Sequence, residues 1–389
     1  MTNRAHIPTL DGWRAVAIAA VLISHGFILS DSDSRYLRAA SYAAGELGAA
    51  GVALFFAISG YLITTLLLEE LAAAGRISLK AFYIRRAFRI LPPAYLYLFV
   101  LLLLDKPLAE GELWSAAFFF SNYWPDRQWF TQHFWSLSME EHFYFLWPVA
   151  LVWLGPRRAA IAASVVAAVA AVWRPWSLAH VQLAFPALQR TDMRIDAFLY
   201  AGLLAIGMRS RHRARMEAWL GRRWVLMGSV IAVGAVTVWG AAGSSRALPT
   251  LAQSVALPVL LAATILARGS WLHEFLERGP LRWTGRISYG LYLWQQLFLV
   301  SHSAGTLTAA ARGFLPLLAA VFAAASASYY LMEWPVLRYG RGLAARIAGH
   351  PCAGTPQVSW NHEPHAPNAE RSAGIRPRAR SQTTGSSFH

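Results

Sequence analysis

Long apolar runs recur along this chain, and they decide which folds are open to it. Residues 48–68 and 313–331 are two such runs, each about as long as the roughly 20 residues that a helix needs to cross a bilayer core of about 30 Å. Hydrophobic residues make up 56% of the 389 residues and charged residues only 14%, which is too little polar surface for a water-soluble fold of this length. The sequence therefore predicts an all-α, polytopic membrane protein.

The apolar runs predict about ten transmembrane helices. They lie near residues 13–30, 48–70, 88–105, 136–154, 158–174, 195–208, 224–242, 249–268, 287–304 and 313–333. If the N-terminus is cytoplasmic, most of the 35 Lys and Arg residues fall in inside loops and the C-terminal tail, as the positive-inside rule requires. Both termini are thus expected in the cytoplasm. The anionic inner leaflet accounts for the net charge of +15, so no nucleic-acid partner is predicted.

The two ends of the chain differ in composition. Residues 1–345 hold all the apolar runs and form the expected transmembrane domain, whereas residues 346–389 are rich in Pro, Ser, Gly, Arg and His. This second segment is typical of a disordered cytoplasmic tail. The single cysteine, Cys352, excludes a disulfide framework and a thiolate metal site, and no metal is predicted.

The first apolar run carries unusual polar residues. Arg14 and His25 are eleven residues apart, so on a helix they share one face and lie roughly 16 Å apart along the axis. Ionisable residues within a membrane span point to a functional site. The alternative is a signal-anchor helix with charged flanks and one incidental His. Asp11, one turn before Arg14, lies on the same face.

A second cluster of charge stands at the inner end of the third run. Arg85, Arg86 and Arg89 neighbour one another on a helix, because residues three and four apart share a face. Their guanidinium groups match the oxygens of a phosphate. Spacing alone fits a phosphate-bearing substrate and a lipid headgroup equally well.

The fourth run opens with two adjacent carboxylates, Glu140 and Glu141. The helix N-terminal dipole favours acids there, which is one complete explanation. The other is chemical: Glu140 is expected at the depth of His25, where a carboxylate would fix the tautomer of the imidazole and raise its basicity for proton abstraction from a hydroxyl.

Four motifs, taken together and in this order, resemble the acyltransferase-3 family of bacterial membrane O-acyltransferases. They are Leu-Asp-Gly-Trp-Arg at 10–14 with His25, the segment Gly51 to Ile63, the Phe-Tyr-x-Arg-Arg-x-x-Arg-Ile-x-Pro run from Phe82, and Trp-Ser-Leu-Ser-Met-Glu-Glu-His-Phe-Tyr from Trp135. Weaker similarity extends the resemblance over residues 10–340.

The resemblance implies a ten-helix domain that moves an acyl group, usually acetyl, from acyl-CoA to a hydroxyl of a glycan or related acceptor. Arg14 and His25 match the family's Arg-x10-His motif, Arg86 and Arg89 match its Arg-x-x-Arg motif, and Glu140 matches its acid. The predicted mechanism has CoA phosphates on Arg85, Arg86 and Arg89, while Arg14 either helps to bind CoA or pairs with Asp11 and shapes the entry. His25 is the general base and Glu140 its partner.

Some alternatives stay open at this point. Many family members have His where Gln295 stands here, so no role for that His transfers to this chain. A ping-pong route through an acylated residue is the alternative to direct transfer. The acceptor could be a surface polysaccharide, a lipid-linked sugar or a macrolide. The competing class of protein is a multi-span transporter or exporter, which would also carry charged residues within its spans. Either protein would reside in the bacterial cytoplasmic (inner) membrane among its lipids.

Overall fold

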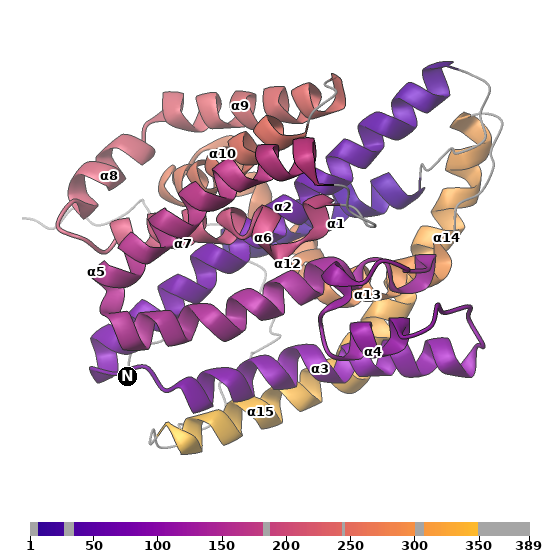
Figure 1. The fold of residues 1–389 in the computed structure, drawn as a ribbon, viewed down its shortest axis with the longest axis horizontal. Helices are drawn as coiled ribbons and strands as arrows, with labels where there is room; N and C mark the ends of the chain where they lie inside the picture. The colour runs from indigo at the N-terminus through magenta and orange to yellow at the C-terminus, as the bar shows by residue number, and fades with distance from the viewer. Residues whose placement is uncertain (1–6, 27–34, 182–186, 243–245, 300–306, 349–389) are drawn as a thin grey trace, which may run out of the picture. The chain divides into compact units, whose positions relative to one another are not determined.

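The computed structural model describes residues 7–26, 35–181, 187–242, 246–299 and 307–348, and every regular element in these ranges is helical (Figure 1). The α-helices are α1 (Pro8–Gly26), α2 (Arg35–Ala74), α3 (Leu79–Leu103), α4 (Glu112–Ala117), α5 (Phe134–His180), α6 (Thr191–Arg194), α7 (Asp196–Gly207), α8 (Arg213–Leu220), α9 (Arg223–Ala242), α10 (Ala247–Leu266), α11 (Trp271–Leu276), α12 (Gly279–Arg286), α13 (Ser288–Phe298), α14 (Leu307–Ser328) and α15 (Trp334–Ile347). Short 3₁₀ turns η1 (Ser121–Tyr123), η2 (Trp129–Thr131) and η3 (Ala187–Gln189) and a π-helical turn η4 (Tyr329–Glu333) complete the set.

Six helical segments in the described part of the chain are long and apolar enough to cross a membrane. They are Ala39–Ala74, Leu79–Leu103, Trp129–His180, Arg223–Ala242, Ala247–Leu266 and Gly313–Ile347. The predicted all-α, polytopic membrane protein is therefore confirmed. The count of ten spans and the cytoplasmic termini stay predictions, and nearly all of the predicted disordered tail, from residue 349 on, lies outside the described residues.

Two of the predicted spans, 136–154 and 158–174, fall within α5. The helix is interrupted between them, because Gly155 has φ 73° and ψ 162° and so leaves the helical conformation. A positive φ of this size is strained for any residue with a Cβ, and glycine adopts it freely. The glycine thus separates two helical halves, 134–154 and 156–180, as the two-span prediction requires.

Helix α1 is enclosed by other helices. A Cβ added at Gly51 of α2 would lie 2.6 Å from the carbonyl oxygen of Ala17, and one at Gly48 would lie 2.5 Å from Ser24. On a second side, a Cβ at Gly285 of α12 would lie 1.9 Å from the carbonyl oxygen of Asp11. Small residues allow backbones to approach this closely in membrane helices. The polar residues of α1 are consequently surrounded by protein.

The connection between α3 and α5 folds around a buried acid. Glu112 is fully buried and accepts hydrogen bonds from the backbone N–H groups of Ala109 (2.6 Å) and Gln128 (2.7 Å) and from the hydroxyl of Thr131. The sequence predicts an interfacial or re-entrant piece over 113–124, and the structure has α4 and η1 there. By tying both ends of the segment together, Glu112 fixes the position of η2, which carries Trp129.

Candidate active site

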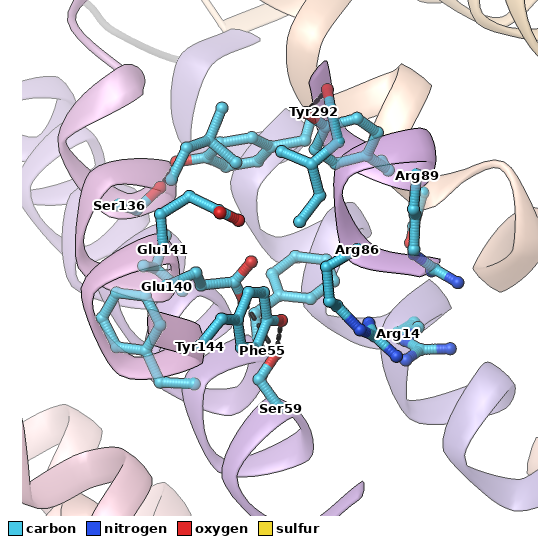
Figure 2. Close-up of a pocket in the computed structure, with 16 residues that line it drawn as sticks. Arg14, Phe55, Ser59, Arg86, Arg89, Ser136, Glu140, Glu141, Tyr144 and Tyr292 are labelled. Carbon is cyan, nitrogen blue, oxygen red and sulfur yellow. Dashed lines mark hydrogen bonds between the residues drawn. The ribbon is translucent and has the colours of Figure 1, made fainter. Parts of the chain in front are cut away.

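A pocket of about 70 Å³ opens between α1, α2, α3, α5 and α13 (Figure 2). Both charged and hydroxyl-bearing side chains reach it. The polar residues that line it are Arg14, Ser59, Arg86, Arg89, Ser136, Glu140, Glu141, Tyr144, Ser288, Tyr289 and Tyr292. All four motifs singled out in the sequence therefore contribute residues to one pocket, which we call the arginine pocket.

Three guanidinium groups reach the arginine pocket from two helices. Arg14 comes from α1, where it pairs with Asp11 at 3.2 Å, and Arg86 and Arg89 come from one face of α3. The guanidinium carbon of Arg86 lies 5.5 Å from the ring centroid of Tyr144, and its Nε is buried without a hydrogen-bond partner among the described residues. A buried donor without a partner is costly, which marks this guanidinium as a candidate ligand-binding group.

Arg85 does not join the other arginines. Its guanidinium donates to Glu70 Oε2 at 3.0 Å, and Glu70 Oε1 accepts the backbone N–H of Ser78 at the start of α3. Arg85 is not among the residues that line the arginine pocket. The sequence predicts Arg85 as a third phosphate ligand on α3, whereas the structure gives it an ion pair that ties α3 to the end of α2.

The two glutamates lie across the arginine pocket from the arginines, as Figure 2 shows. Ser59 of α2 donates to Glu140 Oε1 at 2.8 Å, and the hydroxyl of Tyr144 donates to Ser59 Oγ at 3.0 Å. Glu141 Oε1 is buried and has no hydrogen-bond partner within the described ranges. Two carboxylates thus face three guanidinium groups, of which Arg14 is already paired with Asp11.

His25 lies elsewhere. Its Nδ1 is 2.6 Å from Oε1 of Gln295 on α13, and its ring meets Trp129 edge-to-face with centroids 5.4 Å apart. His25 does not line the arginine pocket, and no hydrogen bond joins it to Glu140 in the described part of the chain. The predicted partnership of Glu140 with His25 is thus not found; the partners are Ser59 for Glu140 and Gln295 for His25.

Helix packing explains why the two residues are apart. Gly48 meets Ser24, and Gly51 meets Ala17, so α1 and α2 run antiparallel and residues further along α2 lie closer to the start of α1. Eight residues beyond Gly51, Ser59 and its partner Glu140 reach the level of Arg14 rather than that of His25. Arg14 and His25 themselves are roughly 16 Å apart along the helix.

A second buried histidine sits near His25. His133 is 2% exposed, and both its backbone N–H (3.2 Å) and its ring Nδ1 contact Oε1 of Gln296. The indole N–H of Trp129 donates to the backbone oxygen of Gln296 at 2.9 Å. From the sequence, His133 is expected to face outwards and not to bind a metal. The signal that could have found it is the pair of adjacent amides, Gln295 and Gln296, within an apolar helix.

Two hydroxyl groups lie between the arginine pocket and the segment next to His25. Ser136 and Tyr292 hydrogen-bond to each other, and both line the arginine pocket. Both hydroxyls also lie within hydrogen-bond distance of the backbone oxygen of His133, Ser136 at 3.1 Å and Tyr292 at 3.3 Å. The polar interior is therefore continuous from the arginine pocket to the segment that covers His25. No group of three potential ligands among His, Cys, Asp and Glu comes together as a metal site in the described residues.

With this geometry in place, comparison with known proteins assigns the class. The chain belongs to the family described as "Acyltransferase domain", which matches residues 7–340. It is 28% identical over 323 residues to the peptidoglycan O-acetyltransferase OatA of Listeria monocytogenes. The aligned residues cover 75% of this chain and 49% of OatA. It is 39% identical over 166 residues to a Staphylococcus aureus protein named "Putative O-acetyltransferase". This alignment covers 38% of this chain and 25% of that protein.

The chain thus matches about half the length of OatA and a quarter of the Staphylococcus aureus protein. No solved structure shows a significant match. The family assignment confirms the resemblance that the four motifs predict.

Proposed function

We propose that this protein is a membrane O-acyltransferase of the bacterial cytoplasmic membrane that transfers acetyl from acetyl-CoA to a hydroxyl of a cell-surface glycan. The family match over residues 7–340 and the O-acetyltransferase names of the relatives support the reaction class. The peptidoglycan in the name of OatA supports a glycan acceptor over a macrolide or another small molecule.

The donor half of the proposal rests on the arginine pocket. Arg14, Arg86 and Arg89 are arranged to hold the phosphates of CoA, because guanidinium groups offer paired donors that match phosphate oxygens. The unpartnered Nε of Arg86 is the donor that a phosphate would satisfy. Glu140 and Glu141 offset part of the positive charge, so that the pocket holds the phosphates without binding them irreversibly.

The transfer half rests on His25. The thiol end of CoA is separated from its phosphates by the long pantetheine arm, and His25 is separated from Arg14 by roughly 16 Å along α1. His25 takes the proton from the acceptor hydroxyl as its oxygen attacks the thioester carbonyl. The carbon–sulfur bond then breaks, and the proton passes from the imidazole to the departing thiolate. Glu140, bonded to Ser59, takes no part in this proton transfer.

One observation carries the proposal most directly: three guanidinium groups meet in one pocket, and one of them, Arg14, belongs to the helix that also carries His25. The test is a pair of measurements on wild type and His25→Ala at equal membrane levels. We expect purified His25→Ala in lipid nanodiscs to bind acetyl-CoA as wild type does. We expect mass spectrometry of surface glycans from cells that express it to show no added acetyl.

Full O-acetylation by His25→Ala would contradict the assignment of the base. Failure of the wild-type protein to bind acetyl-CoA would favour the transporter class instead.

A further inference from the structure

Gln295 stands at the centre of a small arrangement around His25. It lies in α13, its side chain is fully buried, and its Oε1 is 2.6 Å from Nδ1 of His25. His25 is joined to α13 by this bond and to η2 by the ring of Trp129. The imidazole is therefore held from two sides, and only the contact with Gln295 reaches one of its nitrogen atoms in the described residues.

An amide oxygen accepts hydrogen bonds and never donates them. When it lies against Nδ1, that nitrogen must carry the ring proton, and Nε2 of the neutral imidazole then keeps its lone pair. A carboxylate would impose the same tautomer, but it would also add a negative charge. The amide selects the tautomer without adding a charge to an apolar interior.

The amide nitrogen of Gln295 makes no competing contact, since this Nε2 is buried and has no hydrogen-bond partner within the described ranges. The contact with His25 is therefore the one hydrogen bond that the Gln295 amide makes in the described residues. The next residue along the helix, Gln296, turns its own oxygen to His133.

We propose that Gln295 is a positioning residue: it holds His25 in the tautomer with a proton on Nδ1, so that Nε2 is the atom that receives the acceptor's proton. This inference rests on the proposed function, in which His25 is the general base. Gln295 acts through His25 and has no contact with substrate in this role.

The test compares substitutions at Gln295 by pH–rate profiles, in proteoliposomes supplied with acetyl-CoA and the glycan fraction that is acetylated in cells. Gln295→Met keeps the side-chain length and removes the acceptor. We expect the maximal rate to fall roughly ten- to hundredfold, less than the roughly hundred- to ten-thousandfold that a general base contributes, because the base itself is retained, with KM for acetyl-CoA unchanged. The acidic limb of the profile should move to lower pH, because the imidazolium loses a stabilising acceptor.

Gln295→Glu provides the rescue. Its carboxylate accepts the same proton, so we expect most of the rate to return, and the negative charge stabilises the imidazolium. Because the base must be unprotonated to act, the acidic limb should then move to higher pH than in wild type. A purely structural role for Gln295 predicts no such opposite shifts.

Gln296→Met is the matched control, since it removes a buried amide from the same helix that contacts His133 instead of His25. Its acidic limb should stay at the wild-type position. A wild-type profile for Gln295→Met, or an equal shift for Gln296→Met, would overturn the inference while His25→Ala remains inactive. Activity in His25→Ala would instead overturn the proposed function and this inference with it.

Discussion

Arg174 and Arg86 are both arginines within membrane helices, yet their surroundings are opposite. Arg174 is fully buried and donates to Asp196 Oδ1 at 2.6 Å and to the backbone oxygen of Met193 at 2.7 Å. Arg86 has no carboxylate within ion-pair distance in the described part of the chain, and it faces an open pocket. The guanidinium of Arg174 is thus paired and holds helices together, whereas that of Arg86 is available for the ligand that we propose.

The largest expected effect is on stability at the paired site. Arg174→Met leaves Asp196 as an uncompensated buried charge, so we expect a loss of about 3–5 kcal/mol in the free energy of unfolding. Thermal denaturation of the purified protein in detergent measures it. Arg174→Met combined with Asp196→Leu should recover most of the loss, because an apolar pair replaces an ion pair at little cost.

Arg86→Met, the same substitution at the unpaired arginine, should change the melting temperature little. If it destabilised the protein as much as Arg174→Met does, the distinction between a structural arginine and a ligand-binding arginine would fail.

The next effect is on donor binding. Arg86→Met and Arg89→Met should each raise KM for acetyl-CoA roughly ten- to hundredfold, because a hydrogen bond to a charged group contributes about 1.5–3 kcal/mol. Steady-state kinetics in proteoliposomes measure this change. With acetyl-pantetheine, which lacks the nucleotide phosphates, wild type and variants should have the same KM.

Arg85→Met is the matched control, because Arg85 pairs with Glu70 outside the arginine pocket. Its KM should stay at the wild-type value. If KM for acetyl-CoA rose as much in Arg85→Met as in Arg86→Met, Arg85 would be a phosphate ligand, as the sequence predicts.

The smallest effect is expected at Glu140. Glu140→Gln keeps an acceptor for the hydroxyl of Ser59 and removes one negative charge opposite the arginines. We expect kcat to change by less than about tenfold and KM for acetyl-CoA to fall, since phosphate is repelled less. A loss of about a hundredfold or more in kcat, as general-base catalysis would lose, would show that Glu140 serves His25 after all.

The sequence predicted the helical class and much of the site. Arg14, Arg86, Arg89 and Glu140 stand out in the sequence as charged residues within or at the ends of apolar runs, and the structure places all four around one pocket. Helical periodicity was sufficient here, because it says which residues of one helix share a face. The prediction of two spans over 136–174 also agrees with the break at Gly155 in α5.

The partners of these residues were less predictable. Glu140 and His25 lie on different helices, and the relative level of two helices depends on how far one slides along the other. Close contacts such as that of Gly51 with Ala17 set how far one helix is shifted along the other. The periodicity of residues within α1 or α5 gives no information about this shift. Arg85 was misplaced for a similar reason, since its partner Glu70 lies at the end of another helix.

The sequence by itself determined that this chain crosses a membrane, which family it resembles and which charged residues lie within apolar helices. These properties follow from composition, spacing and the cost of burying charge, all of which are local to the chain. Only the tertiary structure decided that His25 meets Gln295, that Glu140 meets Ser59, and that Arg174 is paired while Arg86 faces a pocket. Such pairings depend on the register between packed helices, which is fixed by side-chain contacts between segments far apart in sequence.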